Sequence, residues 1–461
     1  MRAELFLNPV EVKDFCQGEF LHYNPASRIE TVTSDSRDLG QKNLFIPLPG
    51  DKFDGHNFIK DLVVDQKIDC FLSMQSNFQG IAQEKNVTAI KCADTYEALN
   101  CLAAAHRTKM DLKVIGITGT NGKTTVKELV AHILGGQYQV LKNEKNYNNN
   151  IGVAFTLLGL RDVHEVAVVE MGMNHLGEIK RLSEMAKPDL GLITNIGPGH
   201  LEFLGSIENV ALAKREILSG MTPGTKLFIN QQVPYLNLIK EAADLGEIEI
   251  KTFGTNSSAD IFPDRYHLSE KGLSLEYQDQ LFELPLYGIH QVYNLMASLA
   301  LAGELSVDFN LAAKKIADLD NLKGRSQIIE KDYLVINDTY NSNPLSVELA
   351  LDSLQKIFSQ HRKIVVLGDM KELGPESSNW HYQIGQRVAE AKFDLFLSWG
   401  ELSSSYRQGA LEAGLPEEKV YNFEKKSELI SFLQKNIKPL DVILVKGSRS
   451  TKMEEIVEGI T

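Results

Sequence analysis

The stretch GITGTNGKTT, residues 116–125, decides the fold of the chain around it. The apolar run LKVIGIT leads into it and is typical of a buried strand. The segment after it places apolar residues at helical spacing, namely Val126, Leu129, Val130, Ile133 and Leu134. A strand, a glycine-rich loop and a helix start predict a phosphate site, because free backbone N–H groups and the helix dipole point at the anion.

Two side chains of this loop are suited to phosphate chemistry. Lys123 is expected to neutralise charge on the β- and γ-phosphates, and the Thr124 hydroxyl to reach Mg²⁺. The loop departs from the common G-x-x-x-x-G-K-[ST] pattern, because Ile117 stands where that pattern has its first glycine and Gly116 lies one residue earlier. A glycine-rich turn that merely starts a helix is the alternative, and the GKTT sequence in this context argues against it.

Apolar runs alternate with amphipathic helices from Leu112 onward, and the alternation restarts near Asn321. KVIGIT, VAVVEM, LGLITNI and KLFIN are typical of buried parallel strands, as are YLVIND, KIVVLGD, FDLFLSWG and DVILVKGS. A length of 461 residues also favours about three domains. We predict three α/β domains: a small one over 1–107, a central phosphate-loop domain with a mainly parallel sheet over 108–320, and a Rossmann-like one over 321–461.

Two polar residues follow predicted strands of the central domain, where ligands collect in an open parallel sheet. Glu170 ends VAVVE, and His200 follows LGLITNIGPG. A carboxylate suits Mg²⁺, whereas imidazole is an unusual ligand for it. A mere strand-terminal acid and an ordinary loop histidine are the alternatives. Lys214, in ALAKREIL, has the local sequence of a solvated surface lysine.

Composition excludes some classes of partner. The net charge is −13, with 48 basic and 61 acidic residues, which argues against nucleic acid or an anionic membrane as the main partner. Neither a secretory signal nor an apolar run of about 20 residues is visible, so we expect a cytoplasmic protein without membrane insertion. The cysteines show no paired spacing, and we expect all four to be buried free thiols: Cys16, Cys70, Cys92 and Cys101.

Motifs along essentially the whole chain resemble those of the Mur ligase family. Besides the phosphate loop they are, in order, NYNNNIG, VVEMGMNHLGEI, NIGPGHLEFLGS, AKREI, GIHQVYN, GRSQ, DTYNSNP, LGDMKELG and VKGSRS, preceded by DSR, LFIPLPG and DGHNFI. NYNNNIG, DTYNSNP, LGDMKELG and VKGSRS indicate the dipeptide-adding branch. The resemblance implies an ATP-dependent ligase, a cytoplasmic monomer, that joins D-alanyl-D-alanine to UDP-N-acetylmuramoyl-tripeptide in peptidoglycan precursor synthesis.

The resemblance also implies roles for the nucleotide and metal residues. ATP would be bound by Gly119, Thr120, Asn121, Gly122, Lys123, Thr124 and Thr125 of the loop, by His290 and Asn294 near the adenine, and by Arg325 and Asp338 from the third domain. Thr124 and Glu170 would bind the first of two Mg²⁺ ions. His200 and Lys214 would serve the second, with Lys214 carbamylated by CO₂. Lys123, His200 and Lys214 are the residues expected to act in catalysis.

Substrate roles follow from the resemblance in the same way. Ser36 and Arg37 would hold the uridine diphosphate end, and Asn148, Asn149 and Asn150 would line the muramoyl-peptide channel. Asn341, Lys446, Ser448 and Arg449 would meet the dipeptide or nearby phosphates. The alternatives are a polar turn at 148–150, a helix N-cap region at 338–341 and a surface loop at VKGSRS. Gln291 departs from the family's usual Asn, which weakens a role for that side chain.

Two other functions fit parts of the sequence. Another ligase of the superfamily, such as an amino-acid-adding Mur ligase or folylpolyglutamate synthase, would share the phosphate loop. The N-terminal DSR and DGHNFI motifs count against folylpolyglutamate synthase. A regulatory protein that uses the loop as a nucleotide switch would leave the motifs around Glu170, His200, Lys214 and Asp338 unexplained.

Overall fold

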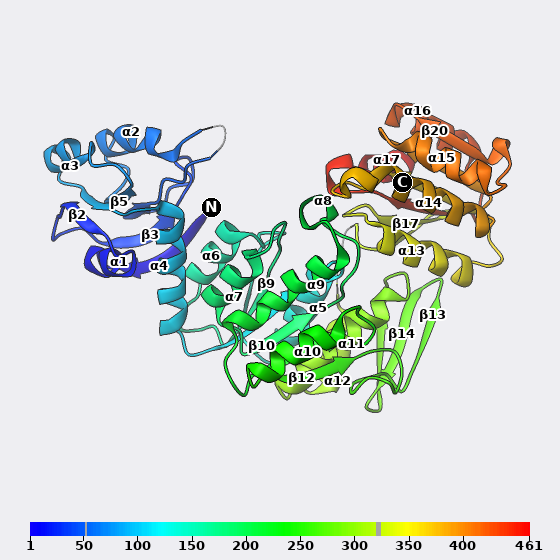
Figure 1. Cartoon of the computed structure of the whole chain (residues 1–461), viewed down its shortest axis with the longest axis horizontal. Helices are drawn as coiled ribbons and strands as arrows, with labels where there is room; N and C mark the ends of the chain where they lie inside the picture. The colour runs from blue at the N-terminus through cyan, green and yellow to red at the C-terminus, as the bar shows by residue number, and fades with distance from the viewer. Residues whose placement is uncertain (51–52, 320–323) are drawn as a thin grey trace.

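The computed structural model describes residues 1–50, 53–319 and 324–461, which form three α/β units (Figure 1). The N-terminal and C-terminal units lie at opposite ends, with the central unit between them. The predicted α/β class and three-domain architecture are confirmed. The predicted boundary between 320 and 321 lies outside the described residues. The boundary between 107 and 108 stays a prediction, next to a helix, α4, that spans Thr95–Lys109.

The N-terminal unit is built on a six-stranded sheet in the order β1-β3-β4-β5-β6-β2. Its four inner strands pair in parallel, and each outer strand runs antiparallel to its neighbour. Helix α4 closes the unit and packs against the central unit. The other elements are β1 (Arg2–Leu7), α1 (Pro9–Phe15), β2 (Glu19–His22), β3 (Ile29–Thr33), β4 (Asn43–Phe45), η1 (Gly55–Phe58), α2 (Ile59–Val64), β5 (Cys70–Ser73), α3 (Gln79–Lys85) and β6 (Thr88–Lys91).

The central unit contains a six-stranded sheet, β12-β11-β10-β7-β9-β8, in which all paired strands are parallel. Helices on both faces bury its strands, which explains their continuous apolar runs. The elements are β7 (Lys113–Thr118), α5 (Lys123–Leu134), β8 (Val140–Lys142), α6 (Asn150–Leu158), β9 (Val166–Glu170), α7 (Glu178–Ala186), β10 (Leu190–Ile193), α8 (Leu201–Leu204), α9 (Ile207–Arg215), η2 (Glu216–Gly220), β11 (Lys226–Asn230), α10 (Leu236–Leu245) and β12 (Glu249–Phe253).

A small antiparallel sheet and two helices complete the central unit. The sheet joins β13 (Arg265–Ser269), β14 (Gly272–Tyr277) and β15 (Gln280–Leu284), and the helices are α11 (His290–Glu304) and α12 (Phe309–Ala317). Leu275 of the small sheet and Leu295 of α11 share a core with Ile115 and Ile117 of β7. This packing places α11 against the phosphate-loop side of the parallel sheet.

The C-terminal unit is a six-stranded sheet in the order β16-β17-β21-β18-β19-β20. Only its edge strand β16 pairs antiparallel among the described strands. The elements are β16 (Gln327–Glu330), β17 (Leu334–Asp338), α13 (Pro344–Ile357), β18 (Lys363–Gly368), η3 (Gly374–Glu376), α14 (Ser377–Glu390), β19 (Leu395–Trp399), α15 (Ser403–Glu412), η4 (Glu417–Lys419), β20 (Val420–Phe423), α16 (Lys426–Asn436), β21 (Val442–Lys446), η5 (Arg449–Thr451) and α17 (Glu454–Ile460).

The order of strands in the central sheet determines where a ligand can bind. From β7 the chain builds β8 and β9 on one side and then returns to place β10 on the other side of β7. Such a switch point opens a crevice beyond the carboxyl ends of the strands. The phosphate loop follows β7 and therefore lies at this crevice.

Two expectations drawn from composition have different outcomes. Three of the four cysteines are buried, but Cys101 is exposed on α4, so the prediction of four buried thiols is wrong for that residue. In the described ranges, no helix is long and apolar enough to cross a membrane.

Helices α14 and α15 approach so closely that only glycine fits at their contact. A Cβ on Gly409 would lie 2.0 Å from the Tyr382 carbonyl oxygen, and one on Gly385 would lie 2.1 Å from that of Tyr406. We expect Gly409→Ala to lower the stability of the C-terminal unit by about 1–3 kcal/mol through overpacking. Urea unfolding followed by circular dichroism measures this change.

Gly80→Ala in α3 is the control, because a Cβ there meets no atom within 4 Å. It should be neutral or stabilise the protein by up to about 1 kcal/mol, since alanine favours helix over glycine. Equal unfolding curves for Gly409→Ala and the wild type would contradict the packing argument.

Candidate active site

The phosphate loop, residues 119–122, is packed between the end of β10 and α11. Gly119 has φ +146°, and a Cβ there would lie 1.9 Å from Thr194 Oγ1. Gly122 has φ +81°, and a Cβ there would lie 2.5 Å from Asn294 Oδ1. Both glycines are needed because the conformation and the space exclude a larger residue.

Polar groups after β10 hold the backbone of the loop. Asn195 Oδ1 accepts a hydrogen bond from the Asn121 N–H at 2.8 Å, and Thr194 Oγ1 donates one to the Asn121 carbonyl at 2.6 Å. The Gly197 N–H donates to Thr120 Oγ1 at 3.1 Å. Thr194 and Asn195 are absent from the predicted set. Their position directly after a predicted strand is the signal that could have found them.

Lys123 and Thr124 occupy the first turn of α5. Lys123 Nζ donates to the carbonyls of Gly119 at 2.7 Å and Thr120 at 3.2 Å, so the side chain folds back over the loop. Burial lowers the pKa of Lys123. Thr124 Oγ1 donates to Glu170 Oε2 at 2.8 Å, which joins the loop to the end of β9.

Glu170 is buried, with 1% of its surface exposed, and is held in place from several sides. Asn148 Nδ2 donates to its Oε1 at 2.7 Å, and its own N–H donates to Asn143 Oδ1 at 2.6 Å. Lys127 Nζ, itself fully buried, lies 3.8 Å from Glu170 Oε2. A fixed carboxylate beside the Thr124 hydroxyl is a pair of hard oxygen donors, and this donor set fits Mg²⁺.

Lys214 is buried in α9, with 1% of its surface exposed, so the alternative of a solvated surface lysine is wrong. Within the described residues its Nζ has no hydrogen-bond partner. Burial, reinforced by the nearby charge of Lys123, lowers the pKa of Lys214 well below its usual value. A buried amine without a hydrogen-bond partner, whose lowered pKa favours the neutral form, fits a group that is converted to a carbamate, which would supply the missing partners.

His200 lies at the contact between the central and C-terminal units. It precedes α8 with φ +56°, and its Nδ1 lies 2.7 Å from Glu372 Oε2 of the C-terminal unit. The Glu202 N–H donates to the Glu372 carbonyl at 3.2 Å. Contact with His200 lowers the pKa of the Glu372 carboxyl. Glu372 comes from LGDMKELG, a motif that carried no predicted site residue.

The C-terminal unit contributes a buried ion pair. Lys446 Nζ donates to Asp338 Oδ2 at 2.6 Å. Although burial opposes it, the charge of Lys446 lowers the pKa of Asp338. Ser326 Oγ lies 3.2 Å from Asp338 Oδ1 and 2.9 Å from His290 Nε2, so the pair also reaches α11. Burial lowers the pKa of His290 to about 4, which makes its imidazole neutral near pH 7.

Arg325 is the second cation on this wall. Its guanidinium stacks on the Tyr340 ring, with Cζ 3.6 Å from the ring centroid. Burial lowers the pKa of Arg325. Gln291, where the sequence departs from the family pattern, accepts a hydrogen bond from Asn294 Nδ2 at 3.0 Å. That bond orients Asn294 beside Gly122.

A cavity of 690 Å³ between the two units brings most of the predicted residues together. Its lining includes Thr120, Asn121, Gly122, Lys123, Thr124, Thr125, Asn148, Glu170, His200, His290, Asn294, Arg325, Asp338, Asn341, Lys446, Ser448 and Arg449. Residues from α5, β9, α11 and β21 thus face one space, although they are scattered over more than 300 positions in sequence. The space combines a phosphate loop, three carboxylates (Glu170, Asp338 and Glu372) and several cations.

The remaining predicted residues do not line this cavity. Gly119 and Lys214 are buried. Asn149 is the N-cap of α6, accepting from the Gly152 N–H at 2.9 Å, and Asn150 is the first residue of that helix. Ser36 and Arg37 lie in the N-terminal unit, with Arg37 paired to Asp35.

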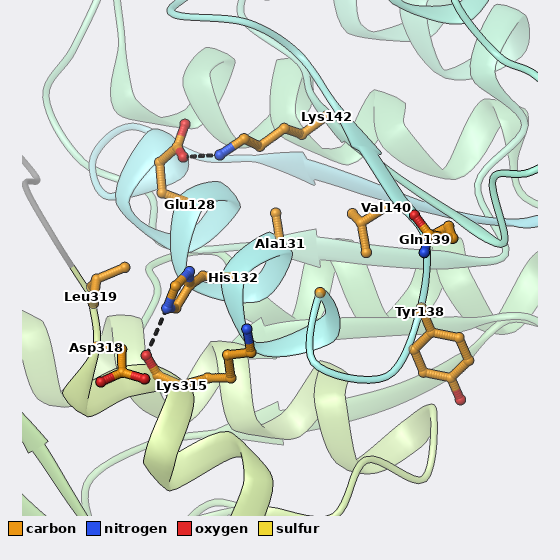
Figure 2. A pocket seen from close by; sticks show the side chains of 11 residues that line it. Glu128, Ala131, His132, Tyr138, Gln139, Val140, Lys142, Lys315, Asp318 and Leu319 are labelled. Atoms are coloured by element: carbon orange, nitrogen blue, oxygen red, sulfur yellow. Dashed lines mark hydrogen bonds and ion pairs between the residues drawn. The ribbon is translucent and has the colours of Figure 1, made fainter.

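A second hollow, of 530 Å³, lies at the far end of α5 (Figure 2). Glu128 pairs with Lys142 on one side of it, and on the other the His132 ring bonds the Lys315 carbonyl at 2.6 Å. As far as the structure describes this hollow, the predicted site residues are not part of its lining. The candidate active site is therefore the larger cavity.

Two family models match the chain. Residues 117–302 match the Mur ligase middle domain, and residues 324–449 match the domain described as Mur ligase, glutamate ligase domain. Together these matches include both walls of the cavity.

Curated relatives match nearly the whole chain. The UDP-N-acetylmuramoyl-tripeptide–D-alanyl-D-alanine ligase of Bacillus subtilis (strain 168) is 35% identical over 438 residues, 94% of this chain and 93% of the relative. The ligase of the same name from Escherichia coli (strain K12) is 32% identical over 450 residues, 94% of each chain.

The chain resembles solved structures to two different degrees. MurF from Acinetobacter baumannii superposes with a TM-score of 0.89 at 30% identity, covering 99% of each chain. A folylpolyglutamate synthase of Mycobacterium tuberculosis complexed with ADP has a TM-score of 0.62 at 18% identity, covering 79% of this chain and 93% of that one. The second likeness is one of fold alone.

We expect Lys123→Ala to weaken binding of a nucleoside triphosphate by about 10- to 100-fold, the range for losing a charged hydrogen-bond donor. Calorimetric titration with a non-hydrolysable ATP analogue measures the affinity, and circular dichroism checks that the fold is kept. Lys142→Ala, at the second hollow, is the control and should bind as the wild type does. Wild-type affinity in Lys123→Ala would show that the phosphate loop is not part of the nucleotide-binding site.

Proposed function

The chain belongs to the Mur ligase family, and we propose that it is the ATP-dependent ligase that joins D-alanyl-D-alanine to UDP-N-acetylmuramoyl-tripeptide in peptidoglycan precursor synthesis. Full-length similarity to ligases of that name supports the choice of substrates. The structural observation that carries the proposal is the cavity in which the phosphate loop and Glu170 face Arg325, Asp338 and Lys446 of the C-terminal unit.

The reaction concentrates negative charge at each stage. The terminal carboxylate of the tripeptide attacks the γ-phosphorus of ATP, which forms an acyl phosphate and releases ADP. The amine of D-alanyl-D-alanine then attacks the acyl carbon, loses a proton, and expels phosphate to leave an amide. Such chemistry requires cations and positioning rather than a protein nucleophile. The cavity meets that requirement with Lys123, Arg325 and Lys446.

The nucleotide would lie across the two units. Lys123 and the backbone N–H groups of 119–125 would hold its phosphates, with His290 and Asn294 towards the adenine. Asp338 and Arg325 would approach from the C-terminal unit. Support comes from the lining of the cavity and from the contact between His290 and Asp338 through Ser326.

The proposal includes two Mg²⁺ ions. Thr124 and Glu170 would hold one, and His200 with carbamylated Lys214 the other. When bound, the ions would neutralise the phosphates and the reacting carboxylate. The chain's own part is to fix these donors: Asn148 and Asn143 orient Glu170, and burial lowers the pKa of the Lys214 amine, which favours the neutral form that would react with CO₂.

The other substrates are assigned by resemblance and by location. Ser36 and Arg37 of the N-terminal unit would hold the uridine diphosphate end, and the stretch 148–150 would guide the muramoyl peptide towards Glu170. Asn341, Lys446, Ser448 and Arg449 would receive the dipeptide or nearby phosphates. We propose that the enzyme is a cytoplasmic monomer and that closure of the C-terminal unit excludes water from the acyl phosphate.

Phosphate release from ATP and Mg²⁺, with the two substrates supplied separately and together, tests the function. We expect release only when UDP-N-acetylmuramoyl-tripeptide and D-alanyl-D-alanine are both present, together with a pentapeptide product identified by mass spectrometry. Release with folate and glutamate instead would favour folylpolyglutamate synthase. Release that requires no acceptor pair would favour a nucleotide-switch protein.

Lys214→Ala should lower turnover by about 100-fold, the upper end of the range for removing a group that organises a metal site. Short carboxylic acids should restore part of the activity, because they can occupy the space of the carbamate. Lys180→Ala, on the exposed side of α7, is the control and should keep wild-type turnover. Full activity of Lys214→Ala without any additive would refute the carbamate.

A further inference from the structure

Two asparagines form a reciprocal pair across the cavity. Asn121 Nδ2 donates to Asn343 Oδ1 at 3.2 Å, and Asn343 Nδ2 donates to Asn121 Oδ1 at 2.7 Å. The pair joins the tip of the phosphate loop to the C-terminal unit, between residues 222 positions apart in sequence. It is a direct link between the loop proposed to hold ATP and the unit proposed to receive the dipeptide.

The Asn121 side of the pair is held in a fixed position. Its N–H and carbonyl are bonded by Asn195 and Thr194 at the end of β10, and a second bond from Asn195 Nδ2 reaches the same carbonyl at 3.2 Å. A side chain on so restrained a backbone presents its amide in one place. A displacement of the loop would therefore be transmitted to Asn343.

The Asn343 side is equally restrained. Asn343 is the N-cap of α13 in a capping box, with the Ser346 N–H donating to its Oδ1 at 3.0 Å and its own N–H donating to Ser346 Oγ at 3.0 Å. Only 6% of its surface is exposed. Its Oδ1 thus accepts from α13 and from Asn121 together, which ties the axis of that helix to the phosphate loop.

The chemistry of the pair suits its position beside phosphates. An ion pair there would be pulled apart or neutralised by a polyphosphate, whereas two amides satisfy each other without net charge. The contact between the two units at the loop therefore uses none of the cations that line the cavity. A neutral, two-bond contact is also weak enough to open when product leaves.

We infer that Asn121 and Asn343 form a latch that positions the C-terminal unit against the phosphate loop, so that the dipeptide amine meets the acyl phosphate before water does. This inference rests on the proposed function. Asn343 acts through Asn121 and the two units, and is a positioning residue. The contact of His200 with Glu372 lies on the same interface and cannot replace it, because it does not touch the loop.

Asn343→Ser separates the latch from the helix cap. Serine caps a helix about as well as asparagine, but its hydroxyl is too short to reach across to Asn121. Asn8→Ser makes the same change in the capping box of α1, where the Asn8 side chain, among the described residues, accepts only from the Glu11 N–H. Comparing Asn343→Ser with Asn8→Ser separates the loss of the contact with Asn121 from the effect of changing a helix cap.

The readout is the phosphate released per amide bond formed. We expect Asn343→Ser and Asn121→Ala each to raise this ratio roughly 2- to 10-fold, the range for one or two lost neutral hydrogen bonds. The KM for the dipeptide should rise, and in Asn343→Ser the KM for ATP should not. The double variant should be no worse than the worse single one, because both remove the same contact.

One phosphate per amide bond in Asn343→Ser, or a double variant whose effect is the product of the two singles, would overturn the latch. A wild-type protein that forms no amide bond would instead overturn the proposed function. The contact between Asn121 and Asn343 is then tested by a second measurement, which does not require catalytic turnover.

That measurement is the distance between spin labels on cysteines placed at the exposed residues Asp244 and Gln408, in a Cys101→Ser background. We expect a narrow distance distribution in the wild type and in Asn8→Ser, and a broader or longer one in Asn343→Ser. Identical distributions in all three proteins would show that the pair does not hold the units together.

Discussion

The site depends on how tightly the phosphate loop is packed between β10 and α11. Thr194 and Asn294 lie so close to Gly119 and Gly122 that the loop can follow only one path. Because this loop joins the central strand of the sheet to α5, the same packing sets the directions of the first side chains of that helix. Those side chains then meet the acid at the end of β9. The packing of this loop therefore constrains both the fold around it and the positions of the side chains in the site.

Burial shapes the electrostatics around this loop. Lys123, Lys214 and Arg325 all have lowered pKa values, because the desolvation of each buried group outweighs the attraction of the carboxylates around it. An arriving polyphosphate would stabilise the charged forms of the groups that face the cavity. Lys214 is different, since it is buried away from the lining and has no hydrogen-bond partner in the described structure. That isolation is why the pKa of Lys214 is lowered well below its usual value.

The N-terminal and C-terminal units are far enough apart for a long substrate to extend from one to the other. The N-terminal unit lies far from the C-terminal unit in Figure 1, with the central sheet between them. A substrate with a nucleotide at one end and a peptide at the other can span such a distance. The contacts at Asn121 and His200 lie on the C-terminal side, where the last bond would form. Closure on that side can therefore be set independently of any ligand contact made by the N-terminal unit.

The sequence by itself determined the strand–loop–helix unit at 116–125, the parallel strands and the residues that end them. These features are local: an apolar run, a glycine pair and a carboxylate at a strand end can be recognised within a few residues. Tertiary structure alone decided that Lys214 is buried, that Asn149 caps a helix and does not line the cavity, and that Asn343 meets Asn121. Helix spacing cannot report the burial of a single lysine, and no local pattern links residues 222 positions apart. Such contacts arise only when separate units pack together.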